Sequence, residues 1–416
     1  MKKLFSLLLA CMMLFLTACN QTPPNETTTG SPQNQEQPKD SELKNTIIYN
    51  GVSDFIDIPS RILFESYGTQ EKNDTWYTFY YSKADGKAYV YCFDPLCKHE
   101  AGKCLARPTD GTRIPLFDLT NTFFINNRFY IAMEYGQIYS CSFDGSDLKI
   151  EYGEGSYSGG NINFYLWSPN FRAYDKYIYI ELEKDENGNP RTLRFNTETK
   201  KMEDLTEKTG NSIQVHFFYN GEIYGQDSKL RVWIKSDLEL KETQFIEALP
   251  TVDKFYGSAF FGNAYDSQGK TSLGIQSYDM KTGESAILSN EMLGLEANPY
   301  VVVTVDENYV YFYQYKQILV GSYINAKGQE KKHYKYNDGK LYRAKHDGTE
   351  CTLIYDNPEF EFDYSEAVIC DNKIITAGHS VGIRNGYADT WDSGMKVGTM
   401  GADGKIEKFE NIELVY

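Results

Sequence analysis

Residues 92–104 hold a group of side chains that can bind a metal ion. They are Cys92, Cys97, His99 and Cys104, spaced C-x4-C-x-H-x4-C over 13 residues. Three thiolates and one imidazole are a known ligand set for a structural zinc ion, and short connections between ligands cost little entropy to close. The spacing departs from those of common zinc motifs. Because three or four protein ligands leave little room for a substrate, we expect a structural role and no catalytic one.

The start of the chain makes a disulfide the first interpretation of the same cysteines. Lys2 and Lys3 precede an apolar run of 15 residues, 4–18. That run is shorter than the roughly 20 residues that span a membrane, and a basic start before it is typical of an export signal. Exported proteins meet oxidising conditions, which favour disulfides. Because the number of clustered cysteines is odd, a zinc site remains open, as does a disulfide to a distant cysteine. The distant cysteines are Cys141, Cys351 and Cys370.

The end of the apolar run carries a second feature. Leu16-Thr17-Ala18-Cys19 resembles the bacterial lipobox. The resemblance implies cleavage before Cys19, acylation of its thiol by lipid such as palmitate, and attachment to the cell membrane on the extracytoplasmic side. The alternative is an ordinary signal peptide with a chance cysteine. Lipid-anchored Cys19 is the interpretation that we carry forward.

The next segment contains nothing that can form a core. Residues 20–40 contain no Leu, Ile, Val, Phe, Tyr or Trp, so no burial offsets the entropy of ordering them. We expect a signal peptide at 1–18, a disordered tether at 19–44 with a span of about 25 Å, and one folded domain at 45–416.

The charge of the chain limits its partners. The formal net charge is −16, and basic clusters are absent from the sequence. Nucleic acid is therefore excluded as a partner, and attraction to anionic lipid cannot replace the acyl chains.

Two further motifs have ordinary structural interpretations. Residues 378–382 match G-x-S-x-G, but a turn is expected after them where a hydrolase elbow needs a helix. Residues 184–190 are rich in oxygen ligands, yet the glycine and the glutamate of a calcium loop are missing from their positions, so we expect a hairpin turn. No catalytic residue can be nominated.

Composition and pattern predict an all-β fold. The chain has 34 Tyr, 24 Phe and 33 Gly, and its Asn-Gly and Asp-Gly pairs suit tight hairpins. Residues 138–148 align with 341–351 as strand, Asp-Gly turn and strand, and looser copies recur. Alternating segments precede the copies, as at 177–182 and 309–313. Their central residues are Leu63, Tyr130, Tyr179, Tyr224, Phe261, Tyr311 and Ile375, a mean spacing of 52 residues.

Repeats of this length predict a β-propeller of seven blades. Six or eight blades and a pair of β-sandwiches are the alternatives. The segment 129–146 resembles the repeat unit of the TolB-like and YWTD propellers, although the Trp of the YWTD motif is missing. The whole chain resembles tethered propeller lipoproteins of low-GC Gram-positive bacteria, a family that often has six blades. That resemblance implies architecture and location, and it implies that the cysteine-histidine segment is a family feature.

Binding is the function that this architecture favours, because propellers gather loops from every blade on one face. Aromatic residues at 165–167 and 387–391 suit contact with a glycan or a peptide. A carbohydrate-active enzyme, a glycosidase or lyase with acidic residues converging on a central pocket, is the first alternative. A structural partner of another envelope protein is the second. The ligand-binding residues are unknown from sequence.

Overall fold

The structure is a computed structural model that describes residues 55–58, 61–68, 75–92, 96–98, 104, 121–132, 137–143, 145, 147–153, 170–182, 188–246, 254–384 and 387–415. The chain divides into two compact units, Met1–Glu36 and Gln37–Tyr416, and every described residue belongs to the second unit. The expected signal peptide, Cys19 and the tether therefore lie outside the described residues.

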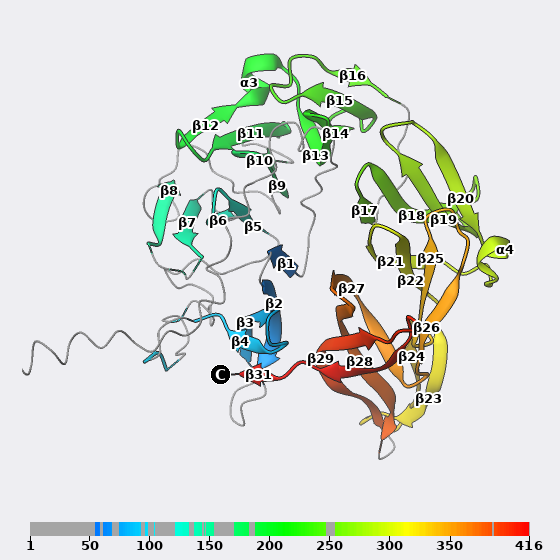
Figure 1. The fold of residues 1–416 in the computed structure, drawn as a ribbon. Coiled ribbons are helices and arrows are strands. Elements are labelled where there is room, and N and C mark those ends of the chain that lie inside the picture. Colours follow the sequence, from blue (N-terminus) through cyan, green and yellow to red (C-terminus); the bar gives the residue numbers. More distant parts are fainter. Residues whose placement is uncertain are drawn as a thin grey trace, which may run out of the picture. The chain divides into compact units, whose positions relative to one another are not determined.

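The described residues form seven blades that follow one another along the chain, each built on four antiparallel strands, and one additional two-stranded sheet (Figure 1). Blades 1 and 2 are β1 (Phe55–Ile58), β2 (Arg61–Gly68), β3 (Thr75–Ser82) and β4 (Ala88–Val90), then β5 (Thr122–Ile125), β6 (Arg128–Ala132), β7 (Ile138–Ser142) and β8 (Lys149–Tyr152). Blades 3 and 4 are β9 (Asn170–Tyr174), β10 (Tyr177–Leu182), β11 (Arg191–Asn196) and β12 (Lys201–Asp204), then β13 (Ile213–Tyr219), β14 (Glu222–Asp227), β15 (Trp233–Asp237) and β16 (Gln244–Phe245). Blade 5 is β17 (Lys254–Tyr256), β18 (Ala259–Tyr265), β19 (Ser272–Asp279) and β20 (Ser285–Ser289).

Blade 6 carries an insertion. Its four strands are β21 (Tyr300–Val305), β22 (Tyr309–Gln314), β25 (Lys340–Lys345) and β26 (Thr352–Asp356), and the hairpin β23 (Ile318–Ile324) and β24 (Glu330–Lys335) forms a sheet of its own between β22 and β25. Blade 7 is β27 (Phe360–Cys370), β28 (Lys373–Arg384), β29 (Tyr387–Met400) and β30 (Ile406–Asn411). The seven-bladed propeller is confirmed. Each of the seven central residues expected from the sequence lies in the second strand of its blade.

Alternate residues of a strand point to opposite faces of its blade, and both faces are buried against neighbouring blades. In β10, Tyr179 packs towards blade 4, whereas Ile178 and Ile180 pack towards blade 2. In β22, Tyr311 packs towards blade 7 and Phe312 towards blade 5. One strand therefore contributes to two cores, which explains why few positions in the second strands are polar.

Hydrophobic clusters join each blade to the next and close the ring. Separate clusters link blades 2 and 3, 3 and 4, 4 and 5, 5 and 6, and 6 and 7. A further cluster joins blades 7, 1 and 2 through side chains that include Ile375, Phe79 and Phe129. The last strand, β31 (Leu414–Val415), adds to blade 1 by pairing in parallel with β4. The two ends of the domain thus meet in blade 1.

The connections differ greatly between the two ends of the blades. Those from first to second strand span two or three residues, and those from third to fourth span four to six. Asn126 and Asn127, between β5 and β6, have φ of 49° and 59°, as a two-residue type I′ turn requires. We call this end the turn end. The other end, the loop end, holds the longer connections, including residues 91–121, the β23–β24 hairpin and two short helices, α3 (Leu205–Thr209) and α4 (Asn290–Leu293).

Polar side chains also join neighbouring blades. Asn263 on β18 accepts a hydrogen bond from the Tyr300 N–H at 2.6 Å and donates one to the Tyr300 carbonyl. Tyr300 begins β21, so this amide satisfies both backbone groups of one residue in the next blade. Glu181 lies in the same place in blade 3, two residues after the central residue of its repeat, and accepts from the Val215 N–H of blade 4. This position in the second strand therefore links its blade to the next one through a side-chain hydrogen bond.

Replacing Asn263 by Ala should lower the free energy of unfolding by about 1–3 kcal/mol, because it leaves a buried N–H and carbonyl of Tyr300 without partners. Denaturant unfolding of N263A beside the exposed-loop control Gln268→Ala measures the difference. A loss no larger in N263A than in Q268A would show that the link does not stabilise the ring.

Candidate functional site

The structure brings three of the four clustered ligands together. The Sγ atoms of Cys92, Cys97 and Cys104 all lie within 4.8 Å of one another. Cys104 is 3% exposed and belongs to the core that joins blades 7, 1 and 2, and Cys92 and Cys97 pack against that core. His99 lies outside the described residues. The sequence prediction that these cysteines form one group agrees with this geometry, and the choice between disulfide and metal stays a prediction.

The backbone before the cluster is held by both neighbouring blades. Directly after β4, the Tyr91 N–H donates to the Thr78 carbonyl at 2.9 Å. The Tyr91 ring is fully buried and meets Phe129 and Phe143 of blade 2 edge-on, with ring centroids 6.4 and 6.0 Å away. Its hydroxyl donates to the Phe143 carbonyl. Cys92 therefore starts from a fixed point between blades 1 and 2.

The remaining cysteines of the folded domain lie in two places. Cys141 and Cys370 are buried in the same core as Cys104. Cys351 packs in another core, between blades 5 and 6, where burial raises the pKa of its thiol to about 11. A thiol with so high a pKa is a poor nucleophile and a poor metal ligand at neutral pH. Cys351 is therefore a suitable comparison residue for the cluster.

A second chemically unusual group is the Glu181 carboxyl, which is almost fully buried between blades 3 and 4. Burial raises its pKa to about 8, although Arg172, the Val215 N–H and the Asn170 amide favour the charged form. The Asn170 Nδ2 lies 3.3 Å from Oε2. Nearby, His216 occupies a bulge in β13 with its ring 4.8 Å from that of Trp233, and burial lowers its pKa to about 4. Sequence analysis missed this site because Glu181 lies within an ordinary alternating strand.

The buried carboxyl predicts a pH dependence of stability. Because its folded pKa is about 8 against an ordinary value of 4.5, its contribution is fully present below about pH 4.5 and is lost as the pH rises to about 8. His216 acts in the opposite sense, because its lowered pKa costs stability as the pH falls from 6.5 towards 4. Glu181→Gln should remove the loss at high pH and leave the effect of His216.

Urea unfolding from pH 5 to 9 checks this. The stability of E181Q relative to the wild type should rise with pH, by at most about 1.4 kcal/mol per pH unit. The exposed control Glu284→Gln should show no such trend. Parallel pH curves for E181Q and wild type would contradict the prediction.

The β23–β24 hairpin is an insertion at the loop end, and the structure describes every residue of its two strands. It contacts β28 and β29 of blade 7 (Figure 1). Pairing places Leu319, Ser322 and Ile324 on one face together with Glu330, Lys332 and Tyr334. Leu319 is 53% exposed and Ile324 is 54% exposed. Two large aliphatic side chains on one face of an inserted hairpin make that face a candidate interaction surface.

The base of the hairpin is fixed to blade 7 by polar contacts. Asn337 donates through Nδ2 to the Phe362 carbonyl at 2.9 Å and accepts from the Phe362 N–H at 3.2 Å. Glu361 accepts from the Tyr336 N–H at 2.7 Å, and its other oxygen lies 3.4 Å from His379 Nε2. Lys335 is buried, donates to the Pro358 carbonyl, and has its pKa lowered by burial. The hairpin is therefore held rigidly on its support.

The structure describes some of the other sequence motifs and leaves others outside the described residues. Residues 378–382 run within β28, and Ser380 pairs with Trp391 of β29, so no helix follows the serine. Gly378 is required there because a Cβ atom would lie 2.2 Å from the Phe360 ring. Of residues 184–190, those at 184–187 lie outside the described residues, as do the aromatic residues at 165–167. Residues 387–391 belong to β29.

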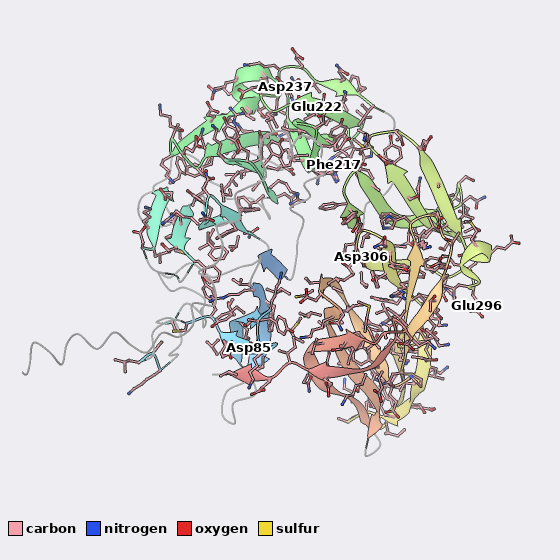
Figure 2. The ribbon with its side chains drawn as sticks, viewed as in Figure 1. Asp85, Phe217, Glu222, Asp237, Glu296 and Asp306 are labelled. Atoms are coloured by element: carbon pink, nitrogen blue, oxygen red, sulfur yellow. The ribbon has the colours of Figure 1, made fainter. Side chains whose placement is uncertain are left out.

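Several acidic side chains labelled in Figure 2 are engaged in turns at the turn end. Asp306 accepts from the backbone N–H groups of residues 308 and 309, each at 2.8 Å. Asp237 accepts from the Lys241 N–H at 2.7 Å, and Asp85 from the Lys87 N–H at 3.1 Å. They belong to different blades and each stabilises its own hairpin, so they offer no converging pair for acid-base chemistry.

Comparison with known proteins finds similar solved structures but no family. No protein-family model matches the chain, and no curated protein matches it. Among solved structures, the β-propeller domain of the trilobed protease from Pyrococcus furiosus is similar at 11% identity and a TM-score of 0.43, over 85% of this chain and 97% of that one. Oligogalacturonate lyase from Vibrio parahaemolyticus is similar at 10% identity and a TM-score of 0.44, over 86% and 92%. A TolB protein from Agrobacterium tumefaciens is similar at 12% identity and a TM-score of 0.28, over 70% and 79%.

These likenesses concern fold alone. The sheets of the chain itself define a seven-bladed β-propeller, and TolB-like and other propellers are among its structural neighbours. Among the described residues, no helix has the length and apolar character needed to cross a membrane.

Proposed function

We propose that this chain is a lipid-anchored extracytoplasmic lipoprotein whose propeller binds a protein or peptide partner at the loop end. The observation that carries the proposal is the free face of the β23–β24 hairpin, where Leu319 and Ile324 are about half exposed. Exposed aliphatic side chains on a rigid support lose little entropy on binding and gain from burial against a partner. The hairpin therefore acts as the contact surface.

The charge of the hairpin indicates which partner it suits. Residues 316–335 contain five lysines and one glutamate, in a chain whose net charge is −16. Lys316 is paired with Asp338 at 2.8 Å, and Lys335 is buried. Of the other three lysines, Lys332 shares the exposed face of Leu319 and Ile324 with Glu330. Lys331 lies on the opposite face, and Lys327 lies in the turn of the hairpin. A peptide segment that combines an apolar side chain with an acidic side chain placed to meet Lys332 fits this face, because opposite charge raises the association rate and fixes orientation.

The location rests on the N-terminal sequence. The basic start, the short apolar run and Leu16-Thr17-Ala18-Cys19 support export and acylation of Cys19. A lipid on Cys19 followed by a flexible tether would hold the propeller near the membrane without charge attraction. The acidic domain would remain free to face the outside.

Cys19→Ala should release the protein from the membrane or leave it unprocessed, since the mutation removes the acylated thiol. Membrane fractionation and intact mass of the full chain measure both results, with Cys351→Ala as the control. Normal cleavage and continued membrane association of C19A would rule out the anchor.

Binding to the hairpin can be tested with arrays of acidic and neutral peptides and of glycans, probed with the full chain. We expect acidic peptides to be selected, and the double variant Leu319→Ser/Ile324→Ser to lower their affinity about tenfold or more, as loss of central apolar contacts does. Ile287→Ser, which alters an aliphatic residue 43% exposed on blade 5, is the control. Selection of glycans, or equal affinity in both variants, would overturn this assignment.

A further inference from the structure

We propose that Cys92, Cys97 and Cys104 bind a zinc ion through their thiolates, and that this ion fastens the connection between blades 1 and 2 to the core where the ring closes. The site is structural. It is independent of the partner-binding surface on the hairpin.

The geometry fits a metal better than a disulfide. In tetrahedral coordination with Zn–S bonds of about 2.3 Å, the sulfurs lie about 3.8 Å apart. The three Sγ atoms lie within 4.8 Å of one another, so small shifts bring all three to a common ion. A disulfide would use two of them and leave the third sulfur beside the bond without a chemical role. Three mutually close sulfurs are what a three-thiolate site requires.

The chemistry of the ligands selects the class of ion. Thiolates are soft ligands that favour zinc over magnesium or calcium. Three thiolates fill three positions of a tetrahedral zinc ion, and one further donor completes the set. The connection thereby gains a fixed point that its own sequence, poor in strand pattern, does not supply.

The site lies where the ring closes, so a bound ion would stabilise the closed ring. Cys104 lies in the core shared by blades 7, 1 and 2, and Cys92 follows β4, the strand that pairs with β31. Binding therefore connects the chain after blade 1 to the core that closes the ring. Because the ligands come together only in the folded chain, binding should stabilise the fold.

The test uses the full chain, produced with its N-terminal segment in a bacterial host and purified anaerobically without chelator. Elemental analysis should find one zinc per chain, and Cys97→Ser should lose it, whereas Cys351→Ser should keep it. Replacement by cobalt should give the visible absorption of a tetrahedral thiolate site, and Cys97→Ser should lack it. Chelation should lower the Tm of the wild type by about 5 °C or more and leave that of C97S unchanged.

Three results would overturn the proposal. The first is metal-free protein in which mass-spectrometric mapping finds a disulfide among the three cysteines. The second is metal-free protein with all three thiols open to alkylation in the folded state. The third is zinc retained in C97S, which would place the ion elsewhere. If C97S does not fold, the cobalt spectrum of the wild type decides alone, since a spectrum without thiolate bands also overturns the site.

Discussion

Each blade of this ring has apolar side chains on both faces, so no blade can bury its core alone. Ile178 and Tyr179 are neighbours in one strand, yet they belong to the cores on opposite sides of blade 3. The hydrophobic stabilisation of every blade therefore depends on the presence of both neighbours, and the ring must close before the last two faces are buried. The core between blades 7, 1 and 2 is where this requirement is met.

This constraint separates the parts of the molecule that are limited by packing from those that are free to vary. The turn end needs only short connections with positive φ, and its Asp and Asn side chains stabilise them. The loop end tolerates insertions because no neighbouring blade is disturbed by them. The hairpin β23–β24, the connection at 91–121 and the two short helices all lie there. Features that distinguish this propeller from others should be sought at that end.

Local pattern was sufficient to place the second strand of every blade, because alternation and turn dipeptides are set by neighbouring residues. Helix α4 also has local signals in the sequence, because Ser289 caps its start and Gly294 ends it in the left-handed region. The sequence also contains a capping signal for helix α3, because the Asp204 side chain accepts a hydrogen bond from the Glu207 N–H. The step of 64 residues between Tyr311 and Ile375, against a mean of 52, also indicated an insertion. The burial of Glu181 and the pairing of β31 could not be predicted, because both depend on residues from another blade.

The pairing of β31 with β4 has a consequence for how the protein is made. The residues that complete blade 1 are Leu414 and Val415, the last described in the chain, and Ile412 just before them enters the closing core. A chain that emerges from the ribosome or from an export channel with its N-terminus first holds blade 1 unfinished until these residues appear. During that interval one apolar face of blade 1 and one of blade 7 stay open to solvent. Such open apolar faces favour aggregation until the ring closes.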